Sequence, residues 1–131
     1  MKYLLDTSVL IHSLISQPKL NDRALRLLAS DSSELYLSAV SSWEIAIKAG
    51  TGKLALPERP RQIVSRAMRS MSLRSLDITQ VHALAVEDLP NHHRDPFDRM
   101  LIAQALAEGL VLMTADRVFE KYKVEQVFCG K

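Results

Sequence analysis

The chain has a single cysteine, Cys129, among its 131 residues. An intrachain disulfide is therefore excluded, and so is a zinc site built from several cysteine ligands. The scarcity of cysteine favours a reducing, cytoplasmic setting over a secreted one. Aromatic residues make up only 5% of the sequence, which argues against nucleic-acid recognition through platforms of stacked aromatic side chains.

Long apolar segments are also missing from the sequence. No stretch approaches the roughly 18–20 uninterrupted apolar residues that a membrane span requires. The apolar start of the chain is similar to that of a signal peptide, but Asp6 interrupts it and no small-residue cleavage site follows. We therefore expect a cytoplasmic protein without a membrane segment.

The rest of the composition is that of an ordinary globular protein. Apolar residues account for 47% of the chain and charged residues for 24%, which suits one core with a solvated surface. A chain of this length predicts a single domain spanning residues 1–131. The formal net charge of +2 permits a polyanionic partner without requiring one.

Short apolar runs alternate with amphipathic segments along the chain. The runs predict strands at residues 3–5, 35–38, 73–78, 110–113 and 124–128, of which the third is the weakest pattern. Helices are predicted between them, at residues 9–15, 24–28, 41–48, 63–71, 80–88, 96–108 and 117–122. This alternation predicts an α/β fold with a parallel sheet covered on both faces, because parallel strands need crossover connections that pack on the sheet.

Several helix ends carry clear capping signals. Asn21, Thr79 and Asp95 stand where an N-cap is expected, since their side-chain oxygens can accept from free backbone N–H groups. Pro96 suits the first helical position, and Gly109 suits the left-handed residue that ends a helix. The segment between residues 95 and 109 is therefore the most clearly delimited helix in the sequence.

Four acidic residues occupy related positions in this pattern. Asp6 and Asp116 follow predicted strands, and Glu44 and Asp98 are expected in the first turns of helices. In an open parallel sheet, the carboxyl ends of strands and the amino ends of the following helices lie at one edge, where ligands bind. We therefore expect these four carboxylates to face one crevice, although long stretches of sequence separate them.

Four carboxylates in one crevice favour a bound cation. Two like charges ~4 Å apart repel by about 4 kcal/mol even at an effective dielectric near 20, so the cluster needs shared protons or a bound ion. Carboxylate oxygens without cysteine ligands suit Mg²⁺ or Mn²⁺ better than zinc. Such ions typically act on phosphoryl groups, so the four acids predict a metal-dependent site for phosphoryl transfer.

Each acid also has a purely structural interpretation. Ser41 and Glu44 have the spacing of a capping box, and a carboxylate at Asp98 is favoured by the helix dipole. Asp116 alone suits an ordinary turn. Asp6 is the hardest to explain in this way, because an unpaired charge near the buried edge of a sheet is costly. The joint placement of the four acids outweighs the separate explanations.

Four blocks of sequence resemble the motifs of a known family. Residues 5–11 (LDTSVLI) resemble the opening motif of PIN-domain nucleases, and residues 42–45 (SWEI) resemble the second acidic motif. Residues 93–105 (HRDPFDRMLIAQA) resemble the third motif in its bacterial toxin form, and residues 114–116 (TAD) resemble the fourth. The blocks stand in the family's order, so the chain is similar to VapC-like toxins of type II toxin–antitoxin pairs.

The resemblance implies a three-layer α/β/α sandwich, a homodimer, Mg²⁺- or Mn²⁺-dependent cleavage within an RNA strand, and inhibition by a small cognate antitoxin. Carried over by position, the catalytic and metal-binding acids are Asp6, Glu44, Asp98 and Asp116. Of these, Asp6 and Asp98 are expected as direct ligands. Ser8 and Thr114 would be polar supports. Arg99 is a candidate for contact with the scissile phosphate, although an exposed helix position is the simpler interpretation.

Other features have interpretations that are either undecided or purely structural. The arginines of residues 59–74 either bind phosphates or form a solvated helix face, and the sequence does not decide between these. His92 and His93 are adjacent and point in different directions, so we interpret them as loop residues. Trp43 could stack on a base, but packing is the simpler interpretation.

Two other classes of function compete with the nuclease. A phospho-receiver domain would need paired acids after the first strand, where this chain has only Asp6. A non-catalytic RNA-binding or assembly module with the same fold would tolerate substitution of the acids. The RNA target and the number of metal ions per site are not encoded in any recognisable motif.

Overall fold

Five parallel strands form the centre of the molecule, which is described over residues 1–131 by a computed structural model. The strands are β1 (Lys2–Leu5), β2 (Glu34–Ser38), β3 (Arg74–Leu76), β4 (Val111–Thr114) and β5 (Gln126–Phe128). They lie in the order β3-β2-β1-β4-β5, and all four neighbouring pairs are parallel. The predicted parallel sheet is therefore confirmed, with β3 and β5 shorter than the sequence pattern indicated.

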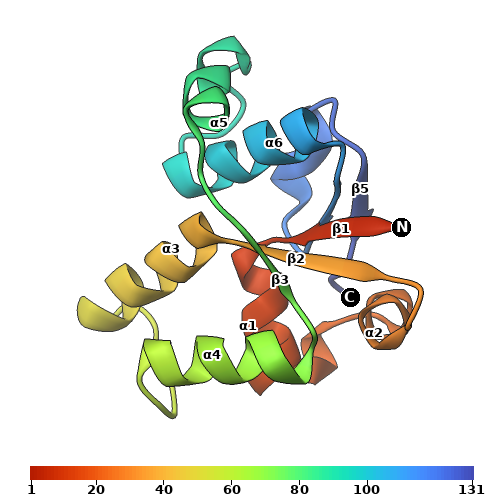
Figure 1. Ribbon diagram of the computed structural model, residues 1–131, viewed down its shortest axis with the longest axis vertical. Coiled ribbons are helices and arrows are strands. Elements are labelled where there is room, and N and C mark those ends of the chain that lie inside the picture. Colours follow the sequence, from red (N-terminus) through yellow and green to blue (C-terminus); the bar gives the residue numbers. More distant parts are fainter.

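Helices cover both faces of this sheet, as Figure 1 shows. They are α1 (Thr7–Ile15), α2 (Asp22–Ala29), α3 (Ala39–Gly50), α4 (Pro60–Ser70), α5 (Gln80–Ala85) and α6 (Pro96–Glu108). Helices α1, α2 and α4 lie on one face, and α5 and α6 lie on the other (Figure 1). The predicted three-layer α/β/α sandwich is thus confirmed. No helix combines the length and the apolar character that crossing a bilayer requires.

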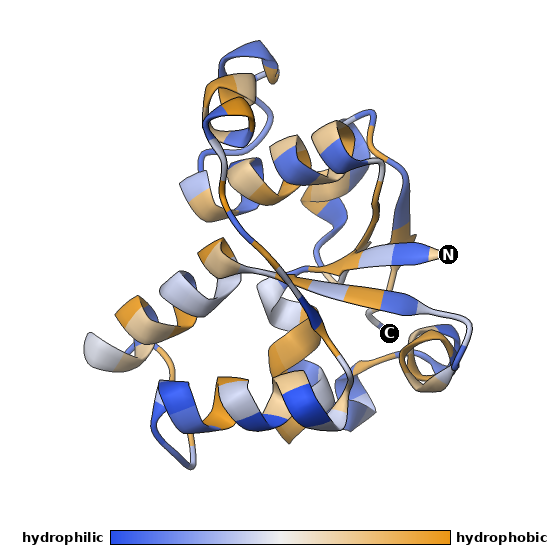
Figure 2. Ribbon diagram, in the orientation of Figure 1, coloured by the Kyte–Doolittle hydropathy of each residue, from blue (hydrophilic) through white to orange (hydrophobic).

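The central strands have apolar side chains on both faces, because helices cover both. In β1, Tyr3 and Leu5 belong to the core shared with α1, α2 and α4, whereas Leu4 belongs to the core against α6. In β4, Met113 belongs to the first of these cores and Leu112 to the core against α6. Figure 2 shows orange segments along the central strands, interrupted by pale and blue residues, and a mixture of orange and blue along the helices. A continuous apolar run is therefore the sequence pattern of a strand buried on both sides.

The helix caps follow the sequence at most ends. Asn21 Oδ1 accepts from Ala24 N–H at 2.9 Å, and Asp95 Oδ1 accepts from Phe97 N–H at 2.9 Å. Thr79 caps α5, and Gly109 ends α6 in the left-handed conformation with φ 67°. These are the ends that the sequence predicted.

The start of α3 differs from the prediction. Ser38, the last residue of β2, is the N-cap, and its Oγ accepts from Val40 N–H at 3.0 Å. Ser41 and Glu44 therefore do not form a capping box, and Glu44 lies in the second turn of α3. The prediction was wrong because α3 begins directly at the carboxyl end of β2, without an intervening turn. This removes the capping explanation of Glu44, whereas its i,i+4 ion pair with Lys48 is present.

The strand order places a topological switch point beside β1. From β1 the chain builds β2 and β3 on one side and later returns to build β4 and β5 on the other. The crevice outside the carboxyl ends of β1 and β4 is where an open parallel sheet binds ligands. Asp6 directly follows β1, and Asp116 comes two residues after β4.

Candidate functional site

Asp6 is buried at this switch point, with only 3% of its surface exposed. It is the N-cap residue of α1, but its side chain makes no capping hydrogen bond. Instead, Asp6 Oδ2 accepts from Ser8 Oγ and from Thr114 Oγ1, both at 2.9 Å. Burial raises the pKa of the Asp6 carboxyl, and the two hydroxyl groups oppose that rise. The carboxylate is thus held in position without a cationic partner.

Glu44 is equally buried, on the side of α3 that faces α1. Its Oε1 accepts from Thr7 Oγ1 at 2.7 Å, and Ser41 Oγ lies 2.9 Å from the same hydroxyl oxygen. Its Oε2 forms an ion pair with Lys48, one turn further along α3. The hydrogen bond to Glu44 raises the pKa of Lys48. Glu44 therefore has a cationic partner, unlike Asp6.

Asp98 occupies the third position of α6 and is partly buried. Its Oδ2 lies 2.7 Å from His93 Nε2. Burial is the main cause that raises the pKa of Asp98 to about 8, and the charges of neighbouring acids add to it: Asp6, Asp95, Glu44 and Asp116. Burial and the surrounding acids therefore both disfavour the charged form of this carboxyl group.

Asp116 is exposed at the rim of the same region. It caps a short 3₁₀ helix (Arg117–Lys121), and its Oδ1 accepts from Val118 N–H at 3.0 Å. Thr114 Oγ1 accepts from the Asp116 N–H at 3.0 Å while it donates to Asp6. The turn interpretation of Asp116 is therefore correct for one carboxylate oxygen, and the other oxygen makes no hydrogen bond.

All four predicted acids line one cleft of about 370 Å³. The other lining residues include Thr7, Ser8, His12, Lys48 and Asp95. Within the cleft region, side-chain ligand atoms of His93, Asp98 and Asp116 lie within 4.8 Å of one another. Asp6 and Glu44 face the same cleft outside this tight group. The expectation that distant acids meet at one edge of the sheet agrees with this arrangement.

The sequence of the chain matches the PIN domain family over residues 3–125. The chain belongs to the PIN domain family. No curated protein matches it in sequence.

Solved structures share the fold of this PIN domain over nearly its whole length. A chain of the VapBC2 complex of Rickettsia felis, bound to a promoter DNA fragment, has a TM-score of 0.75 at 18% identity and covers 98% of this chain and 99% of its own. A chain of FitAcB from Neisseria gonorrhoeae has a TM-score of 0.68 at 24% identity, with 95% of each chain covered. A chain of a toxin–antitoxin complex from Klebsiella pneumoniae has a TM-score of 0.64 at 19% identity, and the match covers 95% of each chain. At these identities the similarity is one of fold.

Two residues at the site of the PIN domain have roles that were not expected from the sequence. Asp95 is the N-cap of α6, as predicted, but it also lines the cleft as a fifth carboxylate. His93 was interpreted as a loop residue without a ligand role, yet its ring contacts Asp98. Its position inside the third motif was the one sequence signal that could have indicated this contact.

A hydrogen-bond network holds the loop that carries His93. The His93 N–H donates to Tyr122 Oη at 2.9 Å, and Tyr122 is buried. Arg99 Nη1 donates to the same hydroxyl at 3.3 Å and to the Pro90 carbonyl at 2.8 Å. Arg99 also donates to the carbonyls of Val86 and Leu89. The tertiary fold therefore fixes where His93 meets Asp98.

These contacts correct the interpretation of Arg99. Its guanidinium group faces the loop before α6, is partly buried, and donates its hydrogen bonds to backbone carbonyls. It is thus neither exposed nor directed at a phosphate in the cleft. The rings of Trp43 and Phe97 pack edge-on with their centroids 5.2 Å apart, but 58% of the Trp43 surface stays exposed. His82 is buried, and its Nε2 lies 2.8 Å from Glu108 Oε2.

The donor set of the cleft fits a hard divalent cation. Asp6, Asp98 and Asp116 offer carboxylate oxygens, and the nearest cation, Lys48, is paired with Glu44. Such oxygen ligands suit Mg²⁺ and Mn²⁺, and one histidine nitrogen is compatible with Mn²⁺ as well. A bound dication would offset the repulsion that raises the pKa of Asp98.

Proposed function

We propose that this PIN domain is a metal-dependent endoribonuclease that acts as the toxin of a toxin–antitoxin pair. Toxins of this family are generally nucleases, and PIN nucleases generally use a divalent metal ion. The observation that carries the proposal is the single cleft into which Asp6, Asp98 and Asp116 present carboxylates that no lysine or arginine neutralises. An acid cluster of this kind suits phosphodiester chemistry better than binding of bare RNA, which it would repel.

The acids proposed to hold the ion are Asp6, Glu44, Asp98 and Asp116. A bound Mg²⁺ or Mn²⁺ supplies an activated water and neutralises charge on the phosphodiester group. Ser8 and Thr114 orient Asp6 through the two hydrogen bonds to its Oδ2. Thr7 and Lys48 hold Glu44 in the same way. Each acid thus has a polar support that fixes its direction, which is a common feature of metal sites.

The purified protein is expected to cleave RNA internally when Mg²⁺ or Mn²⁺ is present and to stop when EDTA removes the ion. The measurement is gel analysis of total RNA incubated with the protein, with cleavage positions mapped by primer extension. Cleavage at an unchanged rate in EDTA would contradict the metal-dependent mechanism. Tight RNA binding with no cleavage in any divalent ion would favour the non-catalytic binding module instead.

The same assay tests the toxin assignment. Similar structures are complexes, and one is described as a toxin–antitoxin complex, which supports a protein partner for this chain. A small protein encoded beside this chain is expected to bind it and to block cleavage at a one-to-one ratio. Cleavage that is unaffected by any neighbouring gene product would contradict the toxin assignment and leave the nuclease proposal intact.

His93 is expected to position Asp98. His93→Ala should slow cleavage about 10–100-fold, the usual effect of losing an outer partner of a metal ligand. His93→Gln keeps a nitrogen donor at a similar distance and should recover much of the rate. The measurement is the cleavage rate together with Mn²⁺ affinity by calorimetry. An equal loss of cleavage rate and Mn²⁺ affinity in both variants would instead indicate that the imidazole nitrogen binds the ion directly.

A further inference from the structure

Helix α4 presents a polar, basic face to solvent. Arg61, Ser65 and Arg69 repeat every four residues, and Gln62 and Arg66 lie beside them, so all five share one side of the helix. These residues form the α4 basic face and, together with Glu58, line a shallow hollow of about 700 Å³ that contains no apolar side chain. Arg66 is paired with Glu58, whereas Arg61 and Arg69 have no ion-pair partner.

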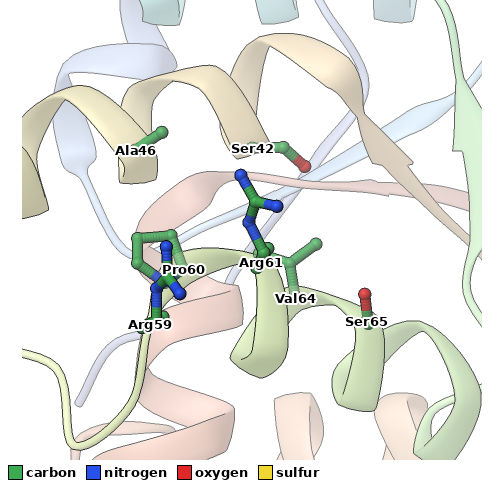
Figure 3. A pocket seen from close by; sticks show the side chains of 7 residues that line it. All are labelled: Ser42, Ala46, Arg59, Pro60, Arg61, Val64 and Ser65. Carbon is green, nitrogen blue, oxygen red and sulfur yellow. The ribbon is translucent and has the colours of Figure 1, made fainter.

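A groove of about 420 Å³ adjoins this face, between α3 and α4. Figure 3 shows the side chain of Arg61 extending from α4 toward Ser42 on α3, with Arg59 beside Pro60 at the start of α4. Arg59 also lacks an ion-pair partner. The groove therefore contains two guanidinium groups whose charge is not neutralised by an acid.

These hollows and the acidic cleft have lining residues in common. Leu54 lines both the acidic cleft and a third hollow, of about 630 Å³, over the segment that joins α3 to α4. That hollow shares Arg59 and Pro60 with the groove. The groove in turn shares Arg61 and Ser65 with the α4 basic face. The acidic cleft, the third hollow, the groove and the α4 basic face are thus successive neighbours on the surface, each sharing lining residues with the next.

We propose that Arg59, Arg61 and Arg69, in the groove and on the α4 basic face, bind the backbone phosphates of the RNA substrate on one side of the cleavage position. The inference rests on the proposed ribonuclease function. Arginine is the side chain best suited to phosphate, because its planar group donates two parallel hydrogen bonds. Arg61 and Arg69 lie about 12 Å apart along the helix axis, so they contact different phosphates. The α4 basic face itself has no apolar side chain, which disfavours an amphipathic protein helix as its ligand, whereas the groove and the third hollow also have apolar lining residues such as Val64 and Leu56.

The test is the salt dependence of RNA binding. A labelled single-stranded oligouridylate of about 20 nucleotides is titrated with protein in EDTA, between about 50 and 200 mM salt. Loss of two phosphate contacts in Arg61→Ala/Arg69→Ala should reduce the slope of log K against log salt by about 1.4. At the lowest salt, affinity should fall at least about tenfold. Arg23→Ala/Arg26→Ala is the matched control, because both arginines are exposed and unpaired on α2.

Four outcomes decide the proposal. A lower slope in the α4 variant alone, with an unchanged melting temperature, supports it. Equal salt slopes in the wild type and both variants would overturn the proposal. An equal loss of RNA affinity in the α4 variant and in the α2 control would also overturn it. The same titration with a poly-glutamate peptide identifies a protein-docking surface: weaker peptide binding with unchanged RNA binding would also overturn the proposal. Because binding is measured without a divalent ion, failure of the nuclease proposal is detected separately, in the cleavage assay.

Discussion

Asp98→Asn and Asp6→Asn are each expected to lower the rate of metal-dependent RNA cleavage by about 10²–10³-fold or more. Asparagine keeps the size of the side chain and removes the negative charge that attracts the ion. Asp6 is buried at the carboxyl end of β1 and held by two hydroxyl groups, so its substitution should change the charge of the site and leave the fold intact. The measurement is a single-turnover cleavage rate at saturating Mg²⁺.

Asp31→Asn is the control for this experiment, because Asp31 lies in an exposed turn after α2 and makes no ion pair. It should retain the wild-type rate. Full activity of the Asp6/Asp98 double variant would rule out the carboxylate mechanism. A loss of activity with a collapsed circular dichroism spectrum would be a folding defect, so thermal melts accompany each rate.

Asp98→Asn is also expected to stabilise the metal-free protein, and increasingly so at higher pH. The pKa of Asp98 is about 8 in the folded protein and about 3.9 in an unfolded chain, because folding buries the group among other acids. The folded state therefore binds this proton more tightly. Its stabilising contribution is complete below about pH 4 and is lost as the pH rises toward 8. The variant has no such loss.

The expected advantage of the variant grows between pH 5 and pH 8 by an amount on the order of 3 kcal/mol, or about 10 °C in melting temperature. Comparison with the wild type at each pH cancels the titration of groups that do not contact residue 98. Added Mg²⁺ should shrink the difference, because it binds the wild-type site and stabilises it by mass action. A difference that does not change with pH or Mg²⁺ would contradict the negative environment assigned to Asp98.

The extent to which this site could be predicted differs between residues. Asp98 was expected at the third position of its helix because Asp95, Pro96 and Gly109 mark both ends of α6 locally. Asp6 was expected at a strand end because an acid directly after Leu4 and Leu5 stops an apolar run. Both inferences use interactions between near neighbours in the chain.

Contacts that join distant segments could not be predicted in this way. The contact between His93 and Asp98 depends on a loop that Tyr122 and Arg99 hold in place. The start of α3 was misplaced because Ser38 and Ser41 are both plausible caps, and only the length of β2 selects Ser38. In each case the deciding interaction involves residues that no local pattern connects.

The four acids remain the centre of this protein. The amino-acid sequence determined the positions of Asp6 and Asp116 after strands and of Asp98 at a helix start, because hydrophobic periodicity and capping are local properties of the chain. The tertiary structure decided which side chains surround the acids: hydroxyl groups at Asp6, Thr7 at Glu44 and His93 at Asp98. It also left Arg61 and Arg69 without acidic partners on the solvent face of α4. Charge neutralisation depends on distance in space, and only the folded chain sets that distance.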